Sequence, residues 1–117
     1  MMRQMNIDER TTSAQQEIRR GTVVLACLLL LRDEDYGYAL LDRLRELGLG
    51  VEANTLYPLL RRLEAQELLV SEWNTDEARP RKFYRTSPQG DHLAVELLRE
   101  WARLDDAIRQ LAREEMR

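Results

Sequence analysis

The stretch Thr55-Leu56-Tyr57-Pro58-Leu59-Leu60-Arg61-Arg62-Leu63-Glu64 carries the pattern that best predicts the fold. Its leucines recur at the spacing of one α-helix face. Pro58 fits such a helix only within the first turn, where its missing N–H costs little. When the leucine face is turned inward, polar and basic side chains lie outward. They are Asn54, Thr55, Pro58, Arg61 and Arg62.

Two more helices are predicted before this one. Ser13 and Gln16 have the spacing of a capping box, so the first helix is expected to begin near Ser13. It continues through the apolar run 23–31, which is apolar on every side and therefore indicates a partner chain. Asp35 is expected to cap a second helix, and Gly48 to end it. The apolar positions of that helix are Leu40, Leu41, Leu44 and Leu47.

A β-hairpin is predicted after the third helix, because the hydrophobic period changes to two. In the first strand, Leu69, Ser71 and Trp73 alternate with Val70, Glu72 and Asn74. In the second, Arg81, Phe83 and Arg85 alternate with Lys82, Tyr84 and Thr86. The connection 75–80 is polar and contains proline, so we expect an exposed, mobile tip.

The last helix is predicted to begin at Ser87-Pro88, an N-cap residue followed by proline at the first helical position. From 88 to 113 it would extend about 39 Å. Its apolar residues follow the a/d repeat of a coiled-coil seam. These candidate dimer-interface residues are Leu97, Trp101, Leu104, Ile108 and Leu111. Because such a helix overhangs a small domain, a second protomer is expected to cover the seam.

Composition limits the function. The chain has 117 residues and a net charge of -3, which predict one mildly acidic domain. Cys27 is the single cysteine and excludes an internal disulfide. The N-terminus lacks a secretory signal, and the longest apolar run is far below the about 20 residues of a membrane span, so a soluble cytoplasmic protein is expected.

An enzyme is not expected. His92 is the only histidine, so no histidine-based metal site or acid–base pair can form within one protomer. The chain has neither a phosphate-binding glycine loop nor a nucleophile elbow. The run Asp33-Glu34-Asp35 is better interpreted as solvated and helix-capping than as a cation site. We predict no cofactor and no metal.

The predicted elements occur in the order of a winged helix-turn-helix, whose third helix enters the DNA major groove. Asn and Arg are side chains that bind base edges or phosphates. The hairpin adds a basic patch to an otherwise acidic chain, which would position the domain on phosphates. The patch contains Arg79, Arg81, Lys82 and Arg85. Two alternatives stay open: Arg61 and Arg62 as a solvated face, and the hairpin charges as protection of a strand edge.

At this point the chain resembles the PadR family of bacterial transcriptional regulators. The resemblance spans 21–111 and rests on Tyr36-Gly37-Tyr38, the stretch 55–64, Trp73, and Arg81-Lys82-Phe83-Tyr84-Arg85 leading to Gly90. It implies a homodimeric winged helix-turn-helix repressor with 55–66 in the major groove and 81–85 in the wing. The tyrosines within these motifs complete the DNA-binding set: Tyr38, Tyr57 and Tyr84. Two pairs depart from the family pattern, Gln66-Glu67 after the third helix and Thr86-Ser87 before the last.

The last helix is similar to that of the short PadR subgroup, which includes multidrug-binding repressors. The subgroup implies that Trp101 and its dimer mate stack an aromatic or cationic compound, with Leu98, Leu25 and Gly21 at matching pore positions. Asp105 lies one helical turn from Trp101 and favours a cation. The alternative is that Trp101 only fills the dimer seam.

These observations predict a mainly α protein with a small β-hairpin, divided into three parts. Residues 1–12 form a flexible arm, 13–86 a winged helix-turn-helix, and 87–117 a dimerisation helix. The expected function is a repressor that binds a pseudo-palindromic DNA operator and is released by a small ligand. One alternative is a repressor without a ligand. Another is a helical module that binds a protein partner and no DNA.

Overall fold

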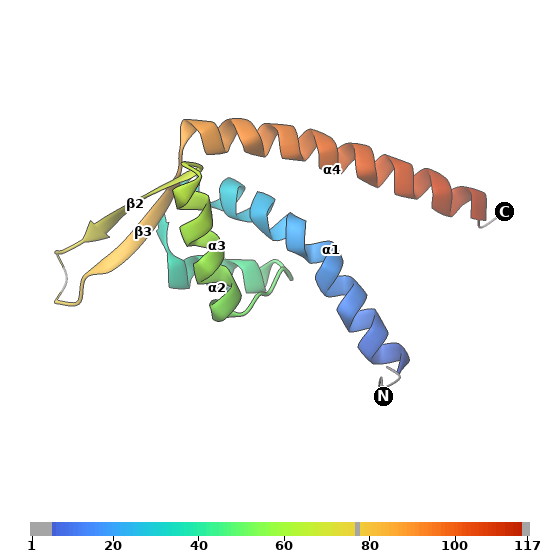
Figure 1. The fold of residues 1–117 in the computed structure, drawn as a ribbon, viewed down its shortest axis with the longest axis horizontal. Coiled ribbons are helices and arrows are strands. Elements are labelled where there is room, and N and C mark those ends of the chain that lie inside the picture. Colours follow the sequence, from blue (N-terminus) through green and yellow to red (C-terminus); the bar gives the residue numbers. More distant parts are fainter. Residues whose placement is uncertain (1–5, 77, 116–117) are drawn as a thin grey trace.

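The computed structural model describes residues 6–76 and 78–115, and it measures 60 × 38 × 26 Å along its principal axes. Its elements, in chain order, are α1 (Ile7–Leu30), β1 (Asp35–Tyr36), α2 (Gly37–Glu46), α3 (Ala53–Ala65), β2 (Leu69–Asn74), β3 (Arg81–Thr86) and α4 (Pro88–Glu115) (Figure 1). The predicted class, mainly helical with a β-hairpin and a long last helix, is confirmed. No helix among these residues is long and apolar enough to cross a membrane.

The start of the first helix differs from the prediction. α1 begins at Ile7, and the Asn6 side chain caps it by accepting a hydrogen bond from the Glu9 N–H at 2.8 Å. Ser13 therefore lies inside the helix, and 7–12 are helical rather than part of an arm. Residues 1–5 of the expected arm lie outside the described part of the chain. Asn6 and Glu9 have the same capping-box spacing as Ser13 and Gln16, and it is the Asn6 pair that caps the helix.

The second helix begins later than expected, and a third strand precedes it. Asp35 does not cap α2. It lies in β1 and pairs with Tyr84 of β3, and its carboxylate accepts a hydrogen bond from the Tyr36 N–H. The sheet order is β1-β3-β2. β2 and β3 have the predicted bounds and pair antiparallel from Leu69↔Thr86 to Asn74↔Arg81. β1 was missed because two residues show no alternation.

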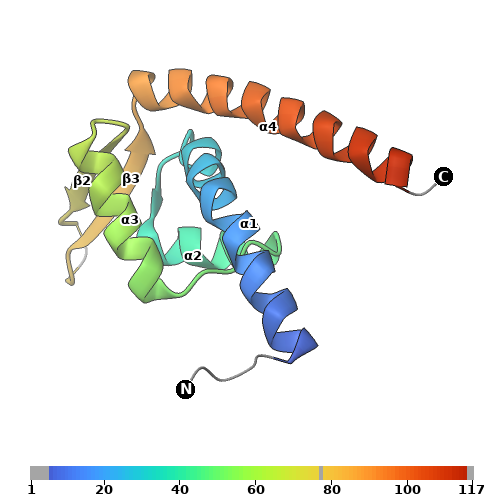
Figure 2. The same cartoon turned by 45° about the vertical axis from the view of Figure 1, so that its right-hand side comes forward.

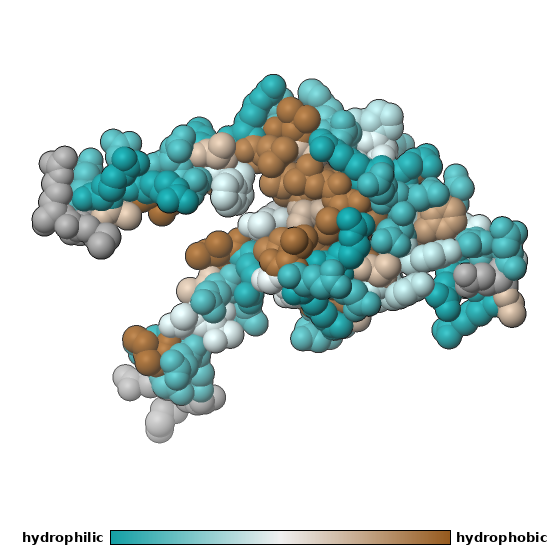
Figure 3. Space-filling model, turned by 180° about the vertical axis from the view of Figure 1, so that it is seen from behind, coloured by the Kyte–Doolittle hydropathy of each residue, from teal (hydrophilic) through white to brown (hydrophobic). Residues whose placement is uncertain are grey.

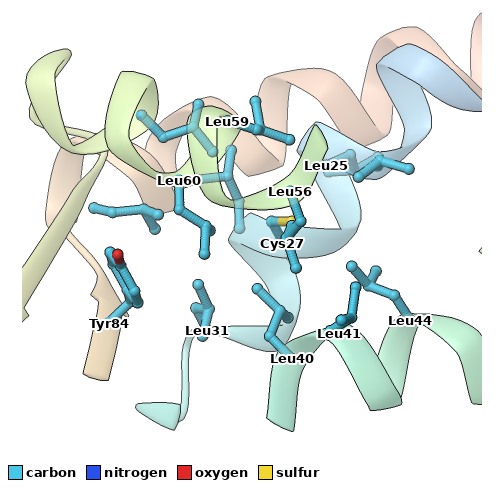
Figure 4. Close-up of a cluster of buried hydrophobic side chains, with 14 of the residues drawn as sticks. Leu25, Cys27, Leu31, Leu40, Leu41, Leu44, Leu56, Leu59, Leu60 and Tyr84 are labelled. Carbon is cyan, nitrogen blue, oxygen red and sulfur yellow. The ribbon is translucent and has the colours of Figure 1, made fainter. Parts of the chain in front are cut away.

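The core lies where α1, α2 and α3 meet above the base of the sheet (Figure 4). Leucines from all three helices are buried, as the predicted stripes require: among them are Leu28, Leu40, Leu44, Leu56 and Leu60. Pro58 lies deeper in α3 than predicted, at the sixth residue rather than in the first turn. It is exposed, so its ring points away from this core.

The far halves of α1 and α4 extend beyond the core and diverge in both ribbon views (Figures 1 and 2). In the view from behind, apolar surface continues outward from the core between α1 and α4 (Figure 3). The run 23–31, expected to be buried on every side, is only half-buried at Val24, Ala26, Leu29 and Leu30. One protomer therefore leaves apolar surface open on both helices.

Candidate nucleic-acid interface

The outward face of α3 presents the residues that its leucine spacing predicted. Asn54, Thr55, Pro58, Arg61 and Arg62 are all exposed, while the stripe of Leu56, Leu59, Leu60 and Leu63 is buried. α3 lies beside the hairpin (Figure 2). Amide, hydroxyl and guanidinium groups on one helix can hydrogen-bond base edges and phosphates in a groove.

Arg61 and Arg62 differ from most of the other described arginines because they have no acidic partner in the described part of the chain. Six of the nine described arginines on the other helices pair with nearby carboxylates, for example Arg43 with Asp35 at 3.5 Å and Arg109 with Asp105 at 3.0 Å. Within 6–76 and 78–115, neither Arg61 nor Arg62 forms an ion pair. Two exposed cations without a counter-charge in an acidic chain leave a local site for an anion.

The helix-turn-helix geometry depends on close contact between α2 and α3. A Cβ on Gly37 would lie 2.6 Å from Cε1 of Tyr57, so only glycine lets the Tyr57 ring pack on the first residue of α2. Tyr57 is consequently half-buried. This places Tyr57 in the joint between the two helices, with part of its surface open to solvent.

The wing is attached to α2 through stacked side chains. The Tyr36 and Tyr38 rings are stacked with centroids 5.6 Å apart, and the Arg81 guanidinium lies 5.1 Å from the Tyr38 centroid. Arg81 also donates to the Tyr38 hydroxyl at 2.7 Å. Tyr38 is 47% exposed. The structure thus brings together two predicted site residues from different elements and orients the Arg81 side chain.

Lys82 and α3 are linked through Glu64. The Lys82 Nζ lies 3.2 Å from Glu64 Oε1, and the Ser71 hydroxyl donates to Glu64 Oε2 at 2.6 Å. The Ser71 hydrogen bond, then that of Lys82, holds the pKa of the Glu64 carboxyl below its usual value. Lys82 is half-buried, and the Glu64 carboxylate partly neutralises its charge. Its main role is therefore to orient the wing, and its attraction for phosphate is weaker.

Tyr84 was predicted as a DNA-binding residue, but the structure places it in the core. Its side chain is 5% exposed, and burial raises the pKa of its phenol. It lies under Lys82, whose Nζ is 5.4 Å from the ring centroid. We correct its assignment from a surface contact to a support for the wing.

The other two basic residues of the predicted patch lie on the surface. Arg79 is exposed, and Nη1 of Arg85 lies 4.0 Å from Oε2 of Glu34.

Sequence reasoning missed Glu64, Ser71 and Tyr36 as residues that shape this surface. Glu64 and Tyr36 stand inside the quoted motifs, but nothing in a linear pattern shows that Glu64 faces Ser71 and Lys82. The antiparallel register supplies that information, because Ser71 pairs with Tyr84 and Trp73 with Lys82 on neighbouring positions.

The predicted dimer residues of α4 form an apolar stripe that is open along most of its length. Trp101, Leu104, Ile108 and Leu111 are 51%, 49%, 64% and 57% exposed. Leu97 differs, because it is half-buried against the core of its own chain. An uncovered stripe of this length on a rigid helix is unusual for a monomer.

The predicted ligand residues are only partly accessible in one protomer. Leu98 and Trp101 are exposed on α4, and Gly21 is exposed on α1. Leu25 is 7% exposed and belongs to the core, so its predicted contact with a ligand is not available in this protomer. Asp105 is bonded to Arg109 at 3.0 Å, which weakens its pull on a cation.

The remaining polar candidates have ordinary positions. Burial raises the pKa of the Cys27 thiol to about 12, so a redox role has no support. His92 is exposed near the start of α4. No group of metal-ligating side chains occurs among the residues for which a structure is described.

Comparison with known proteins extends this description. The model of the transcriptional regulator PadR-like family matches residues 25–95. Transcriptional regulator Rv3488 from Mycobacterium tuberculosis is 38% identical over 100 residues, which cover 85% of this chain and 87% of that protein.

Solved structures of PadR proteins have a similar fold. A PadR family transcriptional regulator from Eggerthella lenta has a TM-score of 0.85 and 46% identity, covering 89% of this chain and 93% of that one. Bacillus subtilis PadR in complex with operator DNA has a TM-score of 0.61 and 23% identity, covering 66% of this chain and 46% of that one. The second likeness is one of fold. Together they confirm the predicted winged helix-turn-helix.

Proposed function

The chain belongs to the PadR-like family of transcriptional regulators, and we propose that it is a homodimeric, sequence-specific DNA-binding repressor. The family and these relatives are transcriptional regulators and not enzymes. The observation that carries the proposal is the pair of exposed arginines on α3, which have no acidic partner among residues 6–76 and 78–115. In the same fold, Bacillus subtilis PadR holds operator DNA. Such a regulator works in the cytoplasm.

In the proposed complex, α3 enters the major groove. Asn54, Thr55 and Pro58 occupy its N-terminal half, which lies closest to base edges, and Arg61 and Arg62 contact bases or phosphates. Arg81 is held toward the wing surface by Tyr38 and contacts the phosphate backbone. This division predicts that Arg81 contributes affinity and that the α3 residues contribute sequence preference.

Dimerisation is proposed because a single α3 cannot read a two-fold operator. The exposed stripe of α4 supplies the surface, with Trp101, Leu104, Ile108 and Leu111 packing against their copies. Two α3 helices would then enter successive major grooves about 34 Å apart. Occupation of a promoter by this dimer excludes polymerase, which is how repression would follow.

The test is fluorescence-anisotropy titration of labelled duplexes from around the gene of this protein, at two salt concentrations and with unrelated competitor DNA. We expect binding that resists competitor and weakens steeply with salt. Arg61→Ala should lower operator affinity by about tenfold or more and reduce the log–log salt slope by about one. Arg45→Ala is the matched control, because Arg45 is exposed on α2 and paired with Asp42. Equal losses in both variants would contradict the role of α3.

Release by a ligand is the finer part of the proposal. Trp101 is half-exposed beside Leu98 and Leu104 on α4, and an indole in an apolar stripe can stack a planar aromatic cation. In the Trp73→Phe variant, Trp101 is the only indole and reports on binding. We expect planar cations to quench its fluorescence and to weaken operator binding. Unchanged fluorescence at saturating concentrations would leave a ligand-independent repressor.

A further inference from the structure

The root of α4 is tied to two other elements by an unusually dense set of hydrogen bonds. The Thr86 hydroxyl donates to the Leu28 carbonyl at 2.7 Å, and the Thr86 N–H donates to the Leu31 carbonyl at 2.8 Å. Leu28 lies in the last turn of α1, where carbonyls have no partner within the helix. Thr86 therefore connects the end of α1 to the residue before α4.

Ser87 makes the corresponding connection to the turn that follows α3. Its N–H donates to the Leu68 carbonyl at 3.0 Å, and its hydroxyl donates to the Glu67 carbonyl at 2.6 Å. The same hydroxyl oxygen accepts the Gly90 N–H and caps α4. A Cβ on Gly90 would lie 2.1 Å from the Leu68 carbonyl oxygen, so the first turn of α4 rests directly on this turn.

An ion pair completes the joint. Arg32 follows α1, and its Nε lies 2.6 Å from Oδ1 of Asp91 in the first turn of α4. From 98 to 114, the α4 side chains are exposed apart from the half-buried Asp105, and Figure 1 shows this part of the helix diverging from α1. The direction of α4 relative to α3 is thus set at its first turns.

We propose that Thr86 is a positioning residue for operator recognition: it locks α4 to α1 and so fixes the half-site spacing that the dimer reads. This inference rests on the proposed function. α4 has 28 residues and is about 42 Å long. With the far half of α4 held in the dimer, a rotation of about 5° at the root moves a point about 40 Å away by about 3.5 Å. That distance is close to the rise of one base pair, about 3.4 Å.

The first experiment compares Thr86→Val with Thr86→Ser. Valine keeps the shape of threonine and removes the hydroxyl, whereas serine keeps the hydroxyl. Thr11→Val is the matched control, because the Thr11 hydroxyl donates to the Ile7 carbonyl at 2.9 Å far from the joint. Operator duplexes are made with the half-sites moved together or apart by up to two base pairs.

We expect the wild type, Thr86→Ser and Thr11→Val to prefer the same spacing. Thr86→Val should prefer a different spacing or lose its preference, with affinity for the original spacing reduced about three- to tenfold. Binding to a single half-site should not change. A Thr86→Val spacing profile identical to that of the wild type would overturn the proposal.

A second measurement needs no DNA. Spin labels at Glu46→Cys on α2 and Gln110→Cys on α4 report the direction of α4 within one protomer when labelled protein is diluted with unlabelled protein. Cys27 is fully buried and does not compete for the label. We expect one narrow distance distribution in the wild type and a shifted or broadened one in Thr86→Val. An unchanged distribution would overturn the locking role.

The proposal can still be tested if Thr86→Val does not fold or if the wild type binds no operator. If Thr86→Val does not fold, Asp91→Asn breaks the exposed Arg32 ion pair, and it should broaden both the spacing preference and the distribution of label distances relative to the wild type. An Asp91→Asn protein that matches the wild type in both would overturn the proposal. If the wild type binds no operator, the proposed function fails, and the label distances alone decide whether Thr86 locks α4.

Discussion

At the residue scale, two helix ends make the same turn with different residues. α2 ends at Glu46; Gly48 in the turn that follows has φ of 77°, and the Leu49 N–H reaches back to the Leu44 carbonyl. α3 ends at Ala65; Glu67 in the turn that follows has φ of 63°, and the Leu68 N–H reaches back to the Leu63 carbonyl. Both are Schellman turns, which favour glycine at this position. Glu67 therefore adopts a backbone conformation that costs a side-chain-bearing residue free energy.

We predict that Glu67→Gly raises the free energy of unfolding by about 1 kcal/mol, because it removes the left-handed strain and keeps the carbonyl that Ser87 uses. Gly48→Ala should lower it by a similar amount, since no atom lies within 4 Å of the added Cβ and only the backbone is strained. Urea denaturation measures both. A Glu67→Gly protein no more stable than the wild type would contradict this account.

At the scale of elements, Glu64 holds the wing against α3 through Ser71 and Lys82. Its carboxyl has a lowered pKa in the folded state, with the Ser71 hydrogen bond as the main cause. A lowered pKa means that the stabilisation is present above the ordinary glutamate value of 4.5 and is lost as the pH falls through the folded value. The attachment of the wing should therefore weaken in acid.

We predict that the wild type loses stability more steeply below about pH 4.5 than Glu64→Gln does. Denaturation midpoints measured between neutral pH and pH 3 provide the comparison. Glu72→Gln on β2 is the control, because Glu72 is an exposed carboxylate that leaves the Ser71 and Lys82 contacts in place. Parallel pH profiles for the wild type and Glu64→Gln would show that this link does not titrate.

Several elements were predictable because their signal is local. The hairpin strands and the start of α4 have the predicted positions, since alternation and the Ser87-Pro88 cap lie within a few residues of the element itself. β1 was not predictable, because Asp35 and Tyr36 become a strand only by pairing with β3. Likewise, Tyr84 is buried because folding brings it into the core cluster with leucines from distant helices.

At the scale of the whole molecule, the length of α4 and its exposed apolar stripe are those expected of a helix that packs against a second protomer. Its apolar stripe remains exposed although α1 and the core cover its first turns. We predict that Ile108→Glu, which introduces a charge into this stripe, converts a dimer to a monomer in sedimentation experiments and weakens operator binding by at least tenfold. The fold should stay intact, because Ile108 is 64% exposed.

Gln110→Glu is the matched control, because it adds the same charge next to the stripe on an exposed polar position. It should leave both the sedimentation coefficient and the operator affinity unchanged. A dimeric Ile108→Glu protein would move the interface away from α4. The diverging far half of α1 would then be the next surface to test.

The sequence by itself determined the segments that become the helices and the two hairpin strands, and which of their faces are apolar, because hydrophobic period, caps and turn residues act over short distances. It also determined the outward set on α3, since a leucine stripe fixes the opposite face. Only the tertiary structure decided which of the described arginines form ion pairs, that Tyr84 is buried, and that Thr86 joins the end of α1 to the root of α4. Those properties depend on groups far apart in the chain, and folding alone brings them within bonding distance.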